Sequence, residues 1–354
     1  MRDELIALAA AGTDGEINRP LVAALASHGL LGRVFAAEGV SARTLCEVRE
    51  ELATFCTEAE TALALQGLGG YPIVLFGKPD VAAQWVPRIA SGEAVAAFAL
   101  TEPDAGSDVA SLSLRADRVD GGYRLTGEKA YISNAPGADI LSAFARTSDT
   151  GAKGITGFAV PGDSPGLSGA PIELISPHPI GRFFFDGVFV PDSHVLGEVD
   201  GGMGVAMRTL NLFRPSVGAF AVGMAQAALD AAVAHVAERQ AFGKRLKDFQ
   251  GVTHQLADVA TAVQAARLLV RDAATAYDEG AHDVASKAAM AKLFATESAQ
   301  RAVDVAVQVH GARALERGHL LEHLYREVRA PRIYEGASEV QREIIARGLF
   351  RGRA

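Results

Sequence analysis

The spacing of apolar residues divides the 354-residue chain into a helical zone, a β-rich zone and a second helical zone. In residues 1–93, the apolar run Leu21–Leu25 is followed by Gly29, a residue type common at the end of a helix. The segment Ser41–Gln66 contains neither Gly nor Pro and predicts one long helix. We expect the glycines and the proline of Gly67–Pro72 to end that helix.

Short β-type runs characterise residues 94–200, where Gly and Pro become frequent. Three runs rich in aromatic or β-branched residues are separated by Gly-containing turns: Tyr123–Thr126, Ile155–Val160 and Phe183–Phe185. Many short strands at this spacing indicate a small antiparallel β domain.

A long amphipathic pattern marks residues 201–354. From Val252 to Glu279 there is no Gly or Pro, and apolar residues recur in alternating steps of four and three. This spacing predicts one apolar stripe along a long helix, as in a bundle or an oligomer core. The stripe comprises Val252, Leu256, Val259, Val263, Ala266, Val270, Ala273 and Tyr277. A second such stretch is Asp283–His310. The order of zones is not the βαβ alternation of a Rossmann fold, so a nucleotide cofactor would need another mode of binding.

Composition and charge exclude several classes of protein. Apolar residues make up 49% and charged residues 21%, which suits a sizeable core and argues against disorder. The formal charge of -8 makes the chain a poor binder of nucleic acid. Cys46 and Cys56 cannot build a disulfide scaffold and suit a reducing cytoplasm. Because the chain shows no targeting signal and no uncharged apolar run of ~18 residues, we expect a cytoplasmic protein that does not enter a membrane.

The first candidate for chemistry is the polar segment Ala99–Asp108, which directly follows an apolar run. A strand that ends in a polar, Gly-containing loop offers hydroxyl and backbone N–H groups to a ligand. The alternative is a simple turn in which Ser107 or Asp108 caps the next element.

The second candidate is Gly127–Asn134. Tyr131 and Ser133 are two residues apart, so they share one face of a strand. This arrangement suits an aromatic ring that stacks on a planar ligand and a hydroxyl that donates a hydrogen bond to it. The alternative is an ordinary half-buried strand.

The third candidate is Ile333–Glu339. Gly336 allows a tight backbone between two helical stretches, and Ser338 is expected to cap a helix at Val340–Arg347. Glu335 follows apolar neighbours, and a carboxylate in an apolar pocket has a raised pKa that makes it a usable base. The alternative is a first-turn carboxylate that favours the helix dipole.

Together these segments resemble the signatures of the acyl-CoA dehydrogenase family of flavoproteins, with similarity from about Gly77 to Arg347. Four motifs in the same order are far more specific than any one of them. The motifs are Ala99–Ser111, Glu238–Lys244 with Phe249–Gln250, Gln308–Gly311, and Ile333–Glu339 with Gln341–Arg342.

The resemblance implies a mostly helical α+β fold. Its parts would be an N-terminal helical domain over residues 1–93, a middle antiparallel β domain over 94–200 and a C-terminal four-helix bundle over 201–354. Relatives form homotetramers arranged as dimers of dimers, so a tetramer or a dimer is expected. The implied cofactor is FAD, no metal is expected, and the implied electron acceptor is an electron-transfer flavoprotein.

The resemblance also implies roles for single residues. Glu335 would remove the α-proton of an acyl thioester while flavin N5 takes the β-hydride, which gives a trans-2-enoyl thioester. Residues implied to contact or position the substrate are Ser107, Arg214 and Gly336. Residues implied to contact FAD are Leu100, Thr101, Ser107, Tyr131, Ser133, Arg239, Phe242, Gln250, Gln308, Gly311, Ala337 and Glu339. Of these, Arg239, Phe242, Gln250, Gln308 and Gly311 would hold the FAD of a neighbouring subunit.

Some positions depart from the family pattern. A subset of relatives carries the base at the position of Phe213, which cannot accept a proton. Ala312 and Ala314 replace glycines of the second signature. The segment Ile175–Phe183 is abbreviated near the implied thioester entrance, so the acyl carrier could be coenzyme A or an acyl carrier protein. Two other interpretations stay open: a flavin oxidase or monooxygenase on the same fold, and a non-catalytic subunit that kept the fold.

Overall fold

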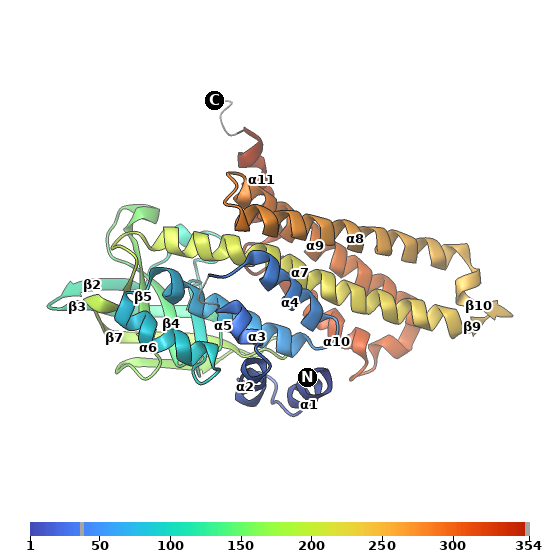
Figure 1. Ribbon diagram of the computed structural model, residues 1–354, viewed down its shortest axis with the longest axis horizontal. Coiled ribbons are helices and arrows are strands. Elements are labelled where there is room, and N and C mark those ends of the chain that lie inside the picture. Colours follow the sequence, from blue (N-terminus) through green and yellow to red (C-terminus); the bar gives the residue numbers. More distant parts are fainter. Residues whose placement is uncertain (36–38, 351–354) are drawn as a thin grey trace. The chain divides into compact units, whose positions relative to one another are not determined.

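The computed structural model describes residues 1–35 and 39–350, so the first and third expected domains each include a few residues outside the described part. The chain forms two compact units (Figure 1). The first combines Met1–Val40 with Thr61–Leu210, and the second combines Ser41–Glu60 with Asn211–Ala354. Two helices continue from one unit into the other, α5 (Thr57–Phe76) and α7 (Gly202–Glu238).

Helices dominate the N-terminal part of the first unit, as expected. They are α1 (Arg2–Ala10), α2 (Arg19–Ser27), α3 (Leu30–Val34), most of α5, and α6 (Pro79–Ala90). Gly29 has a left-handed backbone with φ 72° between α2 and α3, so its predicted role as a helix stop is confirmed.

The prediction of one helix over Ser41–Gln66 was wrong. The segment forms α4 (Ala42–Ala53) and the start of α5, and the break falls at Thr54–Cys56 without Gly or Pro. Thr54 donates both its N–H and its hydroxyl to the Glu51 carbonyl, which tightens the last turn and ends the helix.

The expected break at Gly67–Pro72 was also wrong, because α5 continues through it to Phe76. The glycines there serve close packing. A Cβ added to Gly69 would lie 2.6 Å from the Ala97 nitrogen, so only glycine lets the helix approach strand β1 (Ala96–Ala99). Ser142, on strand β4, donates its hydroxyl to the Gly69 carbonyl at 2.7 Å.

The rest of the first unit is built on an eight-stranded sheet in which the three predicted β runs are confirmed. Besides β1, its strands are β2 (Arg115–Val119), β3 (Gly122–Ser133), β4 (Ile140–Arg146), β5 (Ile155–Pro161), β6 (Leu167–Pro171), β7 (Ile180–Pro191) and β8 (Val195–Leu196). The order is β6-β7-β3-β2-β4-β5-β8, with β1 beside β4. Pairings are antiparallel except β1 with β4 and β2 with β4, so the sheet is mixed. Its buried face carries an aliphatic and aromatic core that includes Leu125, Phe158 and Phe183.

The second unit is helical. Its elements are α4, the C-terminal part of α7, α8 (Gln250–Asp278), α9 (Val284–His310), α10 (Leu320–Glu327) and α11 (Ser338–Phe350), with a small hairpin of β9 (Gln240–Ala241) and β10 (Lys244–Arg245). Helices α8 and α9 pack along each other, and α10 and α11 pack on α9. Gly218 of α7 lies against Val270 of α8, which closes the bundle.

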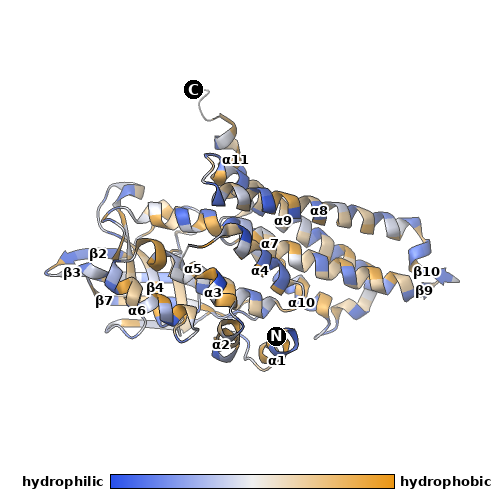
Figure 2. Cartoon of the chain, in the orientation of Figure 1, coloured by the Kyte–Doolittle hydropathy of each residue, from blue (hydrophilic) through white to orange (hydrophobic). Residues whose placement is uncertain are grey.

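The predicted stripe on α8 is confirmed. Its central six residues from Leu256 to Ala273 are buried, and Val252 and Tyr277 at its ends are half-buried. Polar and apolar residues alternate around α8 and α9 in Figure 2, as an amphipathic packing face requires. Among residues 1–35 and 39–350, α7 alone is long and apolar enough to cross a membrane, but 67% of its most apolar window is buried, as in the core helix of a folded bundle.

Candidate functional site

The loop after β1 is tied to β3 by a buried ion pair. The Lys129 ammonium donates to the Leu100 carbonyl at 2.9 Å and to Glu102 Oε1 at 2.8 Å. The carboxylate of Glu102 also accepts from the backbone N–H and hydroxyl of Ser113 and from the Leu114 N–H. The Lys129 and Glu102 side chains are 0% and 2% exposed, so this is a buried, hydrogen-bonded ion pair.

Burial sets the electrostatics of this pair. Burial lowers the pKa of Lys129 to about 8, although the charge of Glu102 works in the other direction. Burial alone would raise the pKa of Glu102, but the Lys129 charge and the hydrogen bonds to Glu102 outweigh it and hold that pKa below its usual value. Sequence interpretation missed both residues; the available signal was a charged side chain within each of the first two motifs.

Next to this pair, β3 contains a β-bulge at one of the predicted residues, Tyr131. The pairing of β3 with β7 shifts register between Lys129 and Ile132. Ala130 N–H turns away from β7 to donate to the Thr101 carbonyl at 3.0 Å. Tyr131 takes a left-handed backbone with φ 57° and leaves its side chain 54% exposed. Such strain, about 1–3 kcal/mol for a non-glycine residue, is typical of ligand sites.

The first unit therefore brings together four predicted residues of the first two motifs. Leu100 is buried at the end of β1, Thr101 and Ser133 are half-buried, and Tyr131 is exposed beside them. An exposed ring next to two hydroxyls can stack on a planar ligand and hydrogen-bond to its edge. Ser107 lies exposed further along the loop, and the following 3₁₀ turn has no side-chain cap from Asp108, so the capped-turn alternative is not what forms.

In the second unit, Glu335 and Gly336 form two successive left-handed residues, with φ 51° and 96°. Three side chains hold their carbonyls. Arg214 Nε donates to the Glu335 carbonyl at 3.1 Å, and Lys292 Nζ donates to the Gly336 carbonyl at 2.7 Å. Gln341 Nε2 donates to both, at 3.2 and 2.8 Å. The φ of 96° at Gly336 is one that L side chains rarely adopt, and a Cβ there would also lie 2.5 Å from Gln341 Nε2, so the turn favours glycine.

The next feature is the carboxylate of Glu335. Its Oε2 atom is buried and has no hydrogen-bond partner among the residues that the structure describes. Burial raises the pKa of Glu335, and the positive charges of Arg49, Lys292 and Arg214 oppose that rise. The direction agrees with the prediction, but the cause differs in part, because the carboxylate lies among buried cations and not in a purely apolar pocket.

These cations are themselves anchored, and sequence interpretation missed most of them. Arg49 of α4 forms a buried ion pair with Glu60 and donates to the Ser216 hydroxyl at 2.6 Å. Lys292 is fully buried on α9, within a run of small apolar residues. A charged residue inside an apolar helix face was the available signal, because a buried ammonium must have a partner.

The helix after Glu335 begins earlier than predicted. Helix α11 starts at Ser338 instead of Val340, and the Ser338 hydroxyl does not cap it but donates to Glu297 Oε1 at 2.7 Å. Of the flanking residues predicted to touch FAD, Ala337 is half-buried and Glu339 is exposed.

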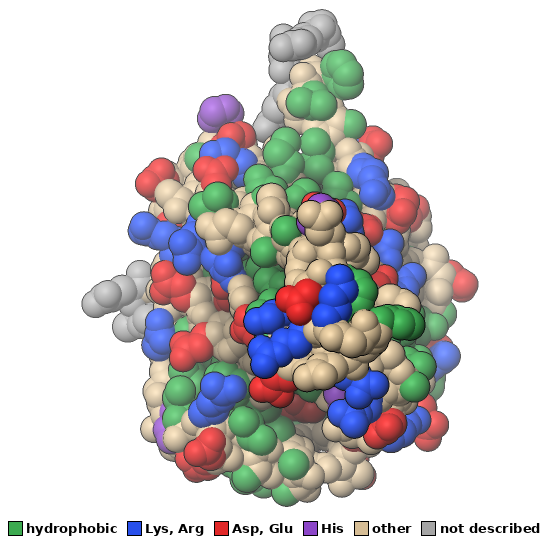
Figure 3. Space-filling view, turned by 90° about the vertical axis from the view of Figure 1, so that its right-hand side faces the viewer, with side chains coloured by type: hydrophobic (Ala, Val, Ile, Leu, Met, Phe, Trp, Pro, Cys, Tyr) green, Lys and Arg blue, Asp and Glu red, His purple; other side chains and the backbone are tan. Residues whose placement is uncertain are grey.

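The remaining predicted cofactor residues cluster where α7 meets α8 through the β9–β10 hairpin and where α9 ends. All five are exposed: Arg239, Phe242, Gln250, Gln308 and Gly311. Phe242 is 96% exposed on a left-handed backbone with φ 53°. Basic side chains gather at this end of the bundle (Figure 3).

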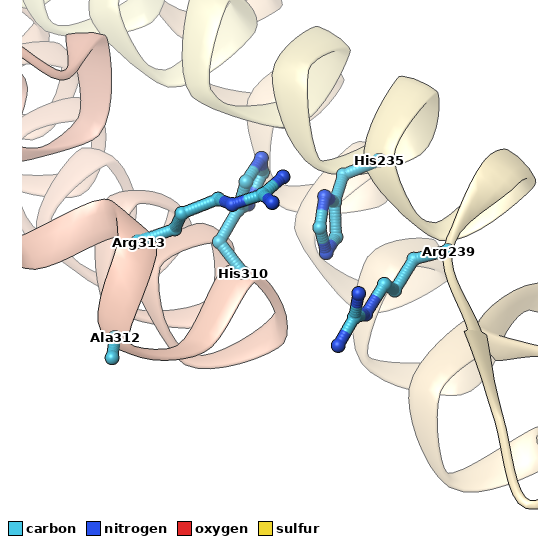
Figure 4. Close-up of a pocket in the computed structure, with 5 residues that line it drawn as sticks. All are labelled: His235, Arg239, His310, Ala312 and Arg313. Carbon is cyan, nitrogen blue, oxygen red and sulfur yellow. The ribbon is translucent and has the colours of Figure 1, made fainter.

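A cavity of about 210 Å³ opens beside them (Figure 4), lined by His235, Arg239, His310, Ala312 and Arg313. The rings of His235 and His310 stack with centroids 4.1 Å apart. Burial lowers the pKa of both imidazoles, and their cationic neighbours lower that of His235 further. Two guanidinium groups around one cavity suit an anionic, phosphate-bearing ligand.

Within one chain, the residues around Arg239 are too far from Glu335 to contact the same part of a bound ligand. Arg214, beside Glu335, and Arg239 are joined by α7, which separates them by ~37 Å at 1.5 Å per residue.

Comparison with known proteins places the chain in a family. Three family models match it in order: the acyl-CoA dehydrogenase N-terminal domain over residues 1–93, the middle domain over 97–188 and the C-terminal domain over 200–350. Cyclohexane-1-carbonyl-CoA dehydrogenase of Geobacter metallireducens is 35% identical, over 99% of this chain and 95% of its own length.

Solved structures agree. Butyryl-CoA dehydrogenase from Megasphaera elsdenii matches with a TM-score of 0.90 at 32% identity, over 95% of this chain and 91% of that chain. PigA in complex with FAD matches with a TM-score of 0.88 at 27% identity, over 94% and 89%. The fold and the sequence thus define a flavoprotein oxidoreductase that acts on CH–CH groups. The chain belongs to the acyl-CoA dehydrogenase family, and it uses FAD to dehydrogenate acyl-CoA.

Proposed function

We propose that the chain converts an acyl-CoA to its trans-2-enoyl-CoA with Glu335 as the base that removes the α-proton. The observation that carries this proposal is the buried Oε2 atom of Glu335, which lies on a left-handed backbone and has no hydrogen-bond partner in the described part of the chain. A carboxylate oxygen without a hydrogen-bond partner among the described residues is free to accept a proton from carbon, and the raised pKa of Glu335 brings its basicity closer to neutral pH.

The backbone of the same residue supplies a second function. The described residues offer no hydrogen-bond acceptor to the Glu335 N–H, while the carbonyls of Glu335 and Gly336 are held by Arg214, Lys292 and Gln341. A fixed, unpartnered N–H can donate to the thioester carbonyl and stabilise the negative charge that develops on its oxygen. The α-hydrogen then becomes acidic enough for a carboxylate to remove it.

The chain's side chains fit FAD in two places. Tyr131, exposed on its bulge, would cover the flavin ring, with Thr101 and Ser133 donating hydrogen bonds to its edge. The cavity beside Arg239 would hold the diphosphate and adenine of a neighbouring subunit's FAD, since the ~37 Å along α7 prevents a role at the same chain's Glu335. Bound FAD supplies the two-electron acceptor that takes the β-hydrogen as hydride.

The proposed assembly follows from this division of the cofactor site. A homo-oligomer, either a dimer or the tetramer implied by the resemblance, would complete each FAD site with Arg239, Phe242 and Gln308 of another subunit. The reduced flavin would pass its electrons to an electron-transfer flavoprotein. Phe213, at the alternative position of the base, is buried and apolar, which supports Glu335 as the base.

The test is the rate at which acyl-CoA bleaches the bound flavin in a stopped-flow instrument. Glu335→Gln should lower this rate by ~10²–10⁴-fold, because general-base catalysis contributes that much, while FAD content stays unchanged. Glu343→Gln, an exposed substitution on α11, is the matched control and should leave the rate unchanged. Bleaching of the Glu335→Gln protein at the wild-type rate would show that another group is the base.

The same assay tests the acyl carrier. A panel of acyl-CoAs and the matching acyl carrier protein thioesters would be compared at equal concentration. Faster bleaching by the carrier-protein thioesters would show that the acyl carrier is a carrier protein and not coenzyme A. The proposed role of Glu335 would be unaffected.

A further inference from the structure

We propose that Lys292 is a positioning residue of this active site, which holds the Gly336 carbonyl and, through its charge, keeps Glu335 ionised as a base. This inference rests on the function proposed above. It concerns a residue that no sequence motif marks, since Lys292 lies in the middle of α9, 43 positions before Glu335.

The geometry gives Lys292 a defined contact. Its side chain is fully buried, and Nζ donates to the Gly336 carbonyl at 2.7 Å. Gly336 follows the base directly, so this hydrogen bond fixes the peptide that carries Glu335 on its left-handed turn. Gln341 donates to the same carbonyl at 2.8 Å, and the two donors together define the direction in which the peptide points.

The next point concerns the charge of Lys292. Within the described residues, no carboxylate lies at ion-pair distance from its Nζ, in contrast to Lys129, which is paired with Glu102. Burial lowers the pKa of Lys292 to about 8, and the charge of Glu335 is the strongest influence that opposes this. The two groups therefore stabilise each other's charged forms.

Other charged and titratable groups act on the same pair. They are Arg49 on α4, Glu60 on α5, Arg214 on α7, Glu297 on α9, Tyr334 beside the base, and Glu339 on α11. Arg49 forms an ion pair with Glu60. Glu297 forms an ion pair with Arg332 at 2.9 Å and accepts a hydrogen bond from the Ser338 hydroxyl. Arg214 donates to the Glu335 carbonyl. Among these groups, Lys292 and Arg214 are the cations that lack a carboxylate partner in the described residues.

The consequence is a pH effect with a definite sign. Glu335 must be deprotonated to act, so activity is lost as pH falls through its pKa. Removing the Lys292 charge removes one influence that lowers that pKa. The acidic limb of the pH profile should therefore move to higher pH.

The experiment compares pH profiles of kcat/KM for the holoenzyme and its variants. Lys292→Met removes the charge and the donor at nearly constant length, and it should move the acidic limb up by about one unit or more, the usual effect of one close charge. Lys292→Arg keeps a charge and should keep the limb near its wild-type position. Lys287→Met, on the same helix but at the surface beside Asp272, is the matched control.

A structural role alone would lower kcat or the melting temperature without moving the limb. FAD content and melting temperature are therefore measured for each variant. If Lys292→Met does not fold, Lys292→Gln serves instead, since it removes the charge with a smaller change in polarity. An acidic limb that stays at the wild-type pH in the folded, charge-free variant would overturn the inference.

Glu335→Gln, measured in the same series, separates this inference from the proposed function. If Lys292 acts through Glu335, Lys292→Met should slow the Glu335→Gln enzyme much less than it slows the wild type at pH 6, because coupled groups are not additive. Equal slowing in both backgrounds would overturn the inference and leave Glu335 as the base. Wild-type activity of Glu335→Gln would overturn the proposed function itself.

Discussion

Removing Lys129 should destabilise the first unit through the carboxylate that it leaves behind. Lys129→Met takes away one of the partners of Glu102, whose side chain is only 2% exposed and cannot reach water for compensation. Breaking a buried ion pair at one side costs ~3–5 kcal/mol. Glu102 keeps its hydrogen bonds from Ser113 and Leu114, so we expect the lower end of this range, ~3 kcal/mol.

This free energy translates into a measurable melting temperature. In a unit of 150–250 residues, 1 kcal/mol shifts the transition by ~2–4 °C, so Lys129→Met should melt ~6–12 °C lower than the wild type. The double variant Lys129→Met with Glu102→Gln should recover much of this loss, since it removes the unpaired charge and keeps an acceptor for Ser113. Thermal unfolding followed by circular dichroism, with the FAD content recorded, measures both.

Two outcomes would contradict this explanation. If the double variant is destabilised by the sum of the two single changes, the charges are not coupled and the pair does not account for the loss. If Lys129→Met melts within a degree or two of the wild type, the buried pair contributes little. Arg115→Met, which breaks the exposed pair with Asp117 in the same unit, is the control and should barely change the transition.

Two further predictions concern the cofactor and the turn. Gly336→Ala should lower kcat/KM at least tenfold, because the new Cβ would disfavour φ 96° and would lie 2.5 Å from Gln341 Nε2. Steady-state kinetics measures this effect. Wild-type values of kcat/KM would show that the turn tolerates a side chain at this position. FAD should bind more tightly to the apoprotein as pH falls from 8 to 5.5, because phosphate favours the protonated forms of His235 and His310, whose pKa values are lowered in its absence. FAD titrations at several pH values measure this effect. His235→Phe keeps the ring stack but not the charge, so it should weaken the pH dependence of FAD binding. An unchanged pH dependence in this variant would show that His235 is not the titrating group.

Local pattern was enough to predict the parts of the fold that depend on one element at a time. The stripe on α8 was correct because the same face of the helix is buried along its whole central length. The interpretation of Gly67–Pro72 as a break was wrong because it treated glycine as a local signal. The real reason for Gly69 is a contact with Ala97, which no pattern in the neighbouring residues records.

The candidate site shows the same division. Glu335, Tyr131 and Phe242 were reached through motifs, and all three have the left-handed backbone that accompanies ligand sites. The buried charges Lys129 and Lys292 were missed. The neighbouring sequence shows at most that each lysine is a charged residue among apolar ones; it does not show the partner, which is 27 positions away for Lys129 and 44 for Lys292.

The two missed lysines solve one physical problem in separate units. A left-handed non-glycine residue costs about 1–3 kcal/mol, and it persists only where surrounding contacts hold it. Lys129 donates to the carbonyl of Leu100, next to Thr101, whose own carbonyl holds the bulge before Tyr131. Lys292 donates to the carbonyl of Gly336, directly after Glu335. A hydrogen bond from a charged donor contributes ~1.5–3 kcal/mol, which is enough to offset one such residue. A buried ammonium that binds a backbone carbonyl therefore stabilises the strained segment without occupying the Tyr131 or Glu335 side chain itself. That second effect suits the roles proposed for these side chains, a ring that stacks on the flavin and a base, because a side chain already engaged within the protein would have to break that contact before it could act.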